Sequence, residues 1–265
     1  MFNSTSLNRI SVPKILIILI SGLLFNGCAI YYPQTTDIPL INEKNELRID
    51  GGISLIPVPM TNRSLLPGIN GTVSYGLTDK IAVQVSGTLL PTAAYYNPTS
   101  QSLINGAVGL YKHNPTTNWT KELYVGIGNG YSTIYSYDDY HSGSLIGNYQ
   151  LYFVQGNIGR RSFKLKFFEF AFGLKLGLIN SHVFVHDVYG IGPIHNDLGA
   201  FIEPAISVKL GGKRLMLNIK PTYCYVRKII KTDFHFEGPY QYSDDYKYSH
   251  LPFGIGLSLN YRFSK

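Results

Sequence analysis

The stretch from Ile81 to Leu89 reads Ile-Ala-Val-Gln-Val-Ser-Gly-Thr-Leu, and it decides the fold class. Apolar and polar residues alternate in it, so isoleucine, valine and leucine share one side, while glutamine, serine and threonine share the other. Successive side chains of a β-strand point to opposite faces. A period of two therefore predicts a strand with one apolar and one polar face.

The same alternation recurs along the chain and predicts an all-β fold. It is clear in Phe168–Leu178, Leu198–Leu210 and Phe253–Phe263, and weakest around 147–158. The ten predicted strands are 46–57, 66–76, 80–92, 102–112, 119–131, 147–158, 165–178, 198–210, 214–226 and 248–263.

The connections between these strands are alternately short and long. Those after the first, third, fifth, seventh and ninth strands are generally the longer ones, at 58–65, 93–101, 132–146, 179–197 and 227–247. Strict alternation places all short turns at one end of an up-and-down sheet. Bacterial outer-membrane barrels have short periplasmic turns, long external loops and an even strand number. We therefore expect a single up-and-down antiparallel transmembrane β-barrel of about ten strands over 46–265.

Composition agrees with a membrane barrel. Only 15% of the residues are charged, against roughly 25% in average globular domains. The mean hydropathy of +0.02 excludes a bundle of transmembrane helices, whereas lipid-facing and lumen-facing residues cancel in the average of a membrane barrel. Aromatic residues gather near both ends of the predicted strands, as in interfacial girdles. The rival fold is a soluble periplasmic barrel with its apolar faces inward.

The first 27 residues predict a secretory signal peptide. Basic Arg9 and Lys14 precede an apolar run from Ile15 to Phe25 that is too short to span a membrane as a helix. Cys28, which follows Gly27, resembles the cysteine of a bacterial lipobox. The resemblance implies a covalent lipid on Cys28 that anchors the chain to the outer membrane on the periplasmic side. We expect 28–45 to be a periplasmic tether, and no cofactor besides the lipid.

Two further motifs resemble outer-membrane material. Tyr31-Tyr-Pro33 and Pro39-Leu-Ile41, with Glu43-Lys44 before the first strand, resemble the opening of small β-barrel lipoproteins common in Bacteroidota-type Gram-negative bacteria. The closing Tyr261-Arg-Phe263 is similar to the aromatic-terminated signal read by barrel-assembly machinery, although two residues follow it. The resemblance implies two partners, the outer-membrane lipid bilayer and that machinery, and it leaves the function open.

Charged residues on the polar faces are nearly balanced in sign, with four acids and five bases. A ten-stranded barrel is close to the eight-stranded size, whose interior is just filled by side chains. We therefore expect these charges to form a salt-bridged plug, with a narrow polar pathway or binding cavity as the alternative. The predicted lumen charges are Arg48, Asp50, Glu122, Glu169, Lys175, Glu203, Lys209, Lys220 and Arg262.

The long loops carry the residues best suited to chemistry. If 179–186 continues a strand, His182 and His186 lie about 13 Å apart, too far to share a metal ion, so we expect no metal site. The tyrosine-rich stretch 240–248 fits a recognition surface. The remaining candidates are Asp187, His195 and Asp197, with the pairs Asp138-Asp139 and Asp244-Asp245.

The net charge of +7 is scattered rather than clustered, so nothing favours nucleic-acid binding. The chain has neither a Gly-x-Ser-x-Gly motif nor a credible serine triad. We therefore expect no catalytic residues and no enzyme, but a structural or surface-interaction role in which the external loops contact a protein or surface partner. One alternative is a narrow small-solute pore or ligand-binding barrel. Another is an omptin-like surface protease, a type that places acidic residues and a His-Asp pair at the loop end; size and strand count match, but no motif at a matching position does.

Overall fold

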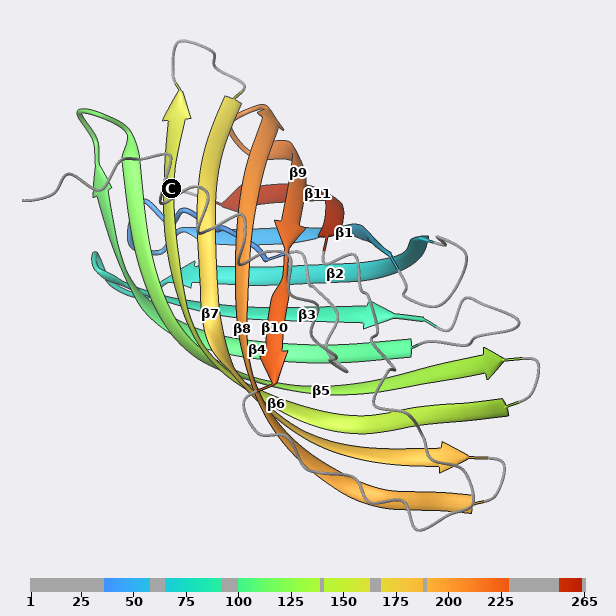
Figure 1. The fold of residues 1–265 in the computed structure, drawn as a ribbon. Coiled ribbons are helices and arrows are strands. Elements are labelled where there is room, and N and C mark those ends of the chain that lie inside the picture. The colour runs from blue at the N-terminus through green and yellow to red at the C-terminus, as the bar shows by residue number, and fades with distance from the viewer. Residues whose placement is uncertain are drawn as a thin grey trace, which may run out of the picture.

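The computed structural model describes residues 36–57, 65–91, 100–138, 141–162, 168–187, 190–228 and 253–263. Cys28, with the rest of 1–35, lies outside these ranges. The described chain is almost entirely strand (Figure 1). No helix in it is long and apolar enough to cross a membrane. The strands are β1 (Leu47–Pro57), β2 (Leu65–Gly76), β3 (Ile81–Leu90), β4 (Ser100–Asn114), β5 (Trp119–Asp138), β6 (His141–Ser162), β7 (Phe168–Asp187), β8 (Gly190–Gly211), β9 (Leu215–Tyr223), β10 (Tyr225–Lys228) and β11 (Phe253–Phe263).

The sheet is antiparallel throughout and closes on itself. Strand β1 pairs with β11, β11 pairs with β9, and β8 pairs with both β9 and β10. Strand β10 continues β9 after a break at Cys224. The eleven segments therefore form ten wall strands of one barrel, which we call staves. This confirms the predicted ten-stranded up-and-down fold.

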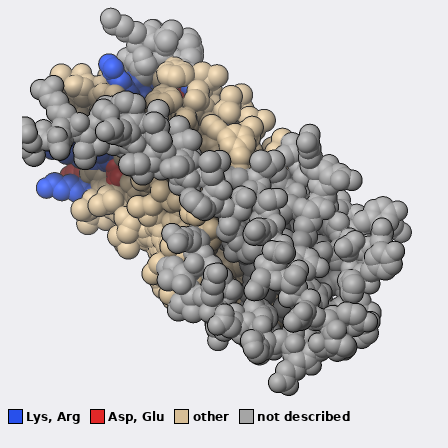
Figure 2. Space-filling model, viewed as in Figure 1, with Lys and Arg blue, Asp and Glu red and all other residues tan. Residues whose placement is uncertain are grey.

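The barrel turns its apolar side chains outward and its polar side chains inward. Ile69, Ile104 and Ile127 are each about 60% exposed on the outer wall, whereas Glu203 and Lys209 are fully buried. A soluble barrel with the apolar faces inward requires the opposite orientation, so the structure contradicts that rival. On the face shown in Figure 2, charged side chains of the described residues gather at one end, which is the end of the short turns.

Strands β5 to β8 are much longer than the sequence predicts. They have 20 to 22 residues each, and Figure 1 shows them running past the ends of β2 and β3. Much of 132–146 and 179–197, predicted as loops, is therefore paired strand. Alternation of apolar and polar residues reveals a strand only where one face of that strand is apolar. The main-chain pairing of β5 to β8 continues beyond the part of the barrel where the outer face is apolar. A spanning strand needs about 9–11 residues, so the β5–β6 and β7–β8 hairpins exceed that length.

Candidate functional site

Part of the expected periplasmic tether lies inside the barrel. The residues from Thr36 to Ile41 are all buried, and none of Thr36, Asp37, Ile38, Leu40 and Ile41 is more than 5% exposed. The main-chain oxygen of Asp37 accepts a hydrogen bond of 2.9 Å from Gln155 in the middle of β6. The main-chain N–H of Ile41 donates to Glu122, near the start of β5, over 2.6 Å. The segment, which we call the lumen segment, therefore descends from mid-barrel to the short-turn end before β1 begins.

Two apolar side chains fix the lumen segment against the wall. Ile38 and Leu40 pack on Ala171 and Ala205. A Cβ atom added at Gly159 would lie 2.4 Å from Cδ1 of Leu40. The absence of a side chain at Gly159 is therefore what admits Leu40, whose backbone has a positive φ of 54°.

The charges at the short-turn end surround one carboxylate. Glu169 is 3.2 Å from Nη1 of Arg48, 3.1 Å from Nζ of Lys209 and 3.0 Å from Nη2 of Arg161. Its partner Arg48 also binds Glu46 over 2.7 Å, and Glu46 is bound by Arg262 over the same distance. A buried charge is costly without partners, and this cluster supplies them on every side.

A second cluster lies higher in the lumen. Nζ of Lys220 is 2.6 Å from Asp50 and 3.6 Å from Asp37 of the lumen segment. Nζ of Lys175 is 3.7 Å from Glu203 and 4.3 Å from the ring centroid of Phe153. The ammonium groups at this level thus have carboxylate partners.

Eight of the nine predicted lumen charges are at most 5% exposed, and the side chain of Arg262 is 13% exposed. Three further charged residues of these clusters, Glu46, Arg161 and Asp37, were not predicted from the sequence. Glu46 lies on the same face of the strand as Arg48 and Asp50, so the alternation pattern could have predicted it as a lumen charge. Asp37 could not have been predicted in this way, because its contacts are with side chains more than a hundred residues away.

The residues proposed for chemistry lie at the long-loop rim, at the tips of two adjacent hairpins. In β5–β6, Asp138 pairs with His141; in β6–β7, Gly143 pairs with Asp187 and Ser144 with His186. These main-chain positions therefore come together on one rim. Further down β7, His182 faces Asn148 and Asn196, Val183 pairs with His195 and Ser181 with Asp197. Within the described residues, no group of three His, Cys, Asp or Glu could hold a metal ion; Asp139, Asp244 and Asp245 lie outside them.

No family model and no curated protein matches the chain. Among solved structures, the chain is similar to the outer membrane protease OmpT from Escherichia coli. The TM-score is 0.53 at 9% sequence identity, and the match covers 87% of this chain and 100% of that one. At this identity the likeness shows the fold, a ten-stranded barrel of the outer-membrane type.

The comparison corrects two predictions. The sequence analysis expected a structural or surface-interaction role and no enzyme. A solved structure whose whole length matches this chain is that of a protease, and this finding contradicts both expectations. The size and strand count of the sequence already match the omptin-like alternative, but the sequence has no local motif at a matching position that points to it.

Replacing Glu169 with glutamine should destabilise the barrel by about 3–5 kcal/mol, because the buried Arg48 and Lys209 and the half-buried Arg161 lose a charge that compensates them. The measurement is the urea unfolding of the refolded protein in detergent micelles, followed by Trp119 fluorescence. Glu43→Gln is the control, since the side chain of Glu43 is 53% exposed and should change the unfolding free energy by less than about 0.5 kcal/mol. Equal effects of the two substitutions would contradict the role given to Glu169.

Gly159→Ala should destabilise the barrel by about 1–3 kcal/mol, because the new methyl group would lie 2.4 Å from Cδ1 of Leu40 and 2.7 Å from Cβ of Ala171. Gly156→Ala is the matched control on the same strand, where an added Cβ meets nothing within 4 Å. Unfolding midpoints of the two variants should separate clearly. Coincident midpoints would show that the lumen segment does not pack at this position.

Proposed function

We propose that the chain is embedded in the outer membrane and works there as a surface hydrolase that cleaves peptide bonds. The outer wall supports the location: isoleucine, valine and leucine side chains stand outward on most staves, as a lipid-exposed barrel requires. A lipid on Cys28 is part of the same proposal and rests on the lipobox resemblance.

The observation that carries the activity is the register at the long-loop rim. It places Asp138, His141 and Asp187 on one face of the sheet, because Asp138 pairs with His141 and Asp187 pairs with Gly143, two residues along β6 from His141. Histidine is the commonest general base because its proton exchanges near neutral pH. A neighbouring carboxylate orients the imidazole and stabilises it when protonated.

The chemistry that such a set performs is the hydrolysis of an amide. The imidazole takes a proton from water while the water oxygen attacks the carbonyl carbon, and the C–N bond then breaks as the leaving amine takes a proton. The lumen segment and its ion pairs fill the opposite end of the barrel, which leaves the long-loop end as the side where a polypeptide can approach. The protease OmpT, which shares the fold, supports peptide bonds as the substrate class.

The two parts of the proposed location can be separated by substituting Cys28. Cys28→Ser should abolish the incorporation of labelled palmitate, yet the protein should stay in membranes washed with alkaline carbonate, because the apolar outer wall holds it in lipid. Cys224→Ser, at the buried second cysteine, should keep the label. Release of Cys28→Ser into the wash would show that the barrel is held by its anchor and not embedded.

The activity is tested on the full chain refolded in detergent micelles, with fluorescently labelled casein as substrate. We expect cleavage that His141→Ala lowers about 10²–10⁴-fold, as for removal of a general base. His113→Ala at the short-turn end is the control and should retain the full rate. Folded protein that leaves casein intact, or equal rates for His141→Ala and the unsubstituted chain, would refute the proposal.

A further inference from the structure

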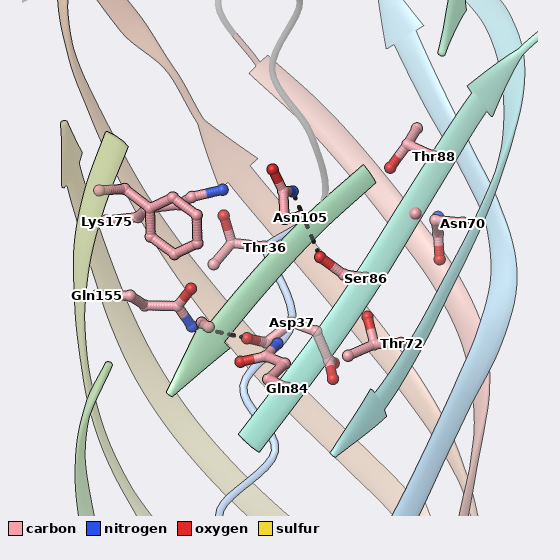
Figure 3. Close-up of a pocket in the computed structure, with 13 residues that line it drawn as sticks. Thr36, Asp37, Asn70, Thr72, Gln84, Ser86, Thr88, Asn105, Gln155 and Lys175 are labelled. Carbon is pink, nitrogen blue, oxygen red and sulfur yellow. Dashed lines mark hydrogen bonds between the residues drawn. The ribbon is translucent and has the colours of Figure 1, made fainter. Parts of the chain in front are cut away.

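A polar pocket lies inside the barrel, directly above the lumen segment, and it belongs to neither the ion-pair cluster at the short-turn end nor the rim (Figure 3). Thr36 and Asp37 form its floor. Asn70 and Thr72 of β2 and Gln84 of β3 face it from one side, and Gln155 of β6 and Lys175 of β7 face it from the other.

Two amide side chains of this pocket have buried atoms without a hydrogen-bond partner among the described residues. Asn70 and Gln84 are each only 6% exposed. Neither the oxygen nor the nitrogen of the Asn70 amide, nor the oxygen of the Gln84 amide, has a hydrogen-bond partner among the described residues. A buried polar group without a partner costs roughly 1–3 kcal/mol. Three such atoms around one pocket indicate that something hydrogen-bonding occupies it.

The charges around the pocket indicate that this occupant is uncharged. Asp37 has Lys220 at 3.6 Å, and Lys175 has Glu203 at 3.7 Å. A charged ligand would compete with ion pairs that are already formed and would remain uncompensated in a buried site. The wall from β2 to β4 is neutral and consists largely of amides and hydroxyls.

The unpartnered atoms also indicate which hydrogen-bond donors and acceptors the ligand must carry. The amide nitrogen of Asn70 donates, whereas the oxygens of Asn70 and Gln84 accept. A hydroxyl group satisfies both kinds of atom, since it donates one hydrogen bond and accepts others. Ala107 and Phe153 supply a small apolar part of the lining, suited to C–H groups.

We propose that this lumen pocket binds a small uncharged polyol or carbohydrate through Asn70 and Gln84. The ligand enters from the long-loop end, because the lumen segment closes the way from the short-turn end. The proposal is independent of the hydrolase activity proposed for the rim.

The test is isothermal titration calorimetry of the full chain in detergent micelles with xylitol and with glucose as probes. We expect saturable binding of at least one probe, weakened about tenfold or more by Gln84→Leu and by Asn70→Leu, each of which removes hydrogen bonds to the ligand. Thr222→Val is the control: Thr222 is buried on β9, has an unpartnered hydroxyl and does not line the pocket.

Ser86→Ala is a milder pocket variant for the case that a leucine variant does not fold, and it too should weaken binding. Two outcomes overturn the proposal. One is a folded chain that binds neither probe, which would mean that the pocket holds water only. The other is binding that Thr222→Val weakens as much as the folded pocket variants do.

Discussion

The structure depends on compensating charge in a closed polar interior. Because the outer wall is apolar, the polar face of every stave must point into the lumen, and ionised groups come with it. Glu169 meets this constraint at the short-turn end, where its carboxylate holds Arg48, Arg161 and Lys209 together. Asp50 and Lys220 do the same further up. The lumen segment adds its own carboxylate and main-chain groups to these contacts, so the interior is completed by a piece of chain that is not part of the wall.

The two ends of the barrel thereby acquire different characters. The short-turn end is crowded with ion pairs and with the apolar contacts of Ile38 and Leu40. At the long-loop end the hairpins β5–β6 and β7–β8 run on beyond the other strands, and histidine and aspartate positions meet at their tips. Between the two lies a neutral polar pocket. The ion pairs that stabilise the barrel, the proposed ligand pocket and the proposed catalytic site therefore lie at successive levels along the barrel axis.

Much of this could be predicted from the sequence, because a strand has a period of two whatever its surroundings. The alternation around Glu169, Lys175 and Glu203 predicted both the strands and the faces on which these charges lie. It could not reveal the lumen segment, whose irregular backbone contacts side chains that are distant in sequence. Nor could it follow β5–β8 past the apolar belt, since strand pairing there no longer depends on one apolar face. The sequence offered Asp138 and Asp187 as candidates but could not show that they meet at the rim with His141, because that proximity arises from the register between the paired strands.

The position of the lumen segment also constrains the order in which the barrel can form. The segment immediately precedes β1, and β1 forms the seam of the barrel with β11, the last strand in the sequence. If the β1–β11 seam closed before Thr36–Ile41 was inside, this segment would have to enter through the short-turn end, which ion pairs already crowd. The seam between β1 and β11 must therefore close around a lumen segment that is already in place. The lumen segment then acts as a template on which the barrel wall is assembled. Substitutions in it would prevent closure of the barrel rather than change the structure of the wall strands.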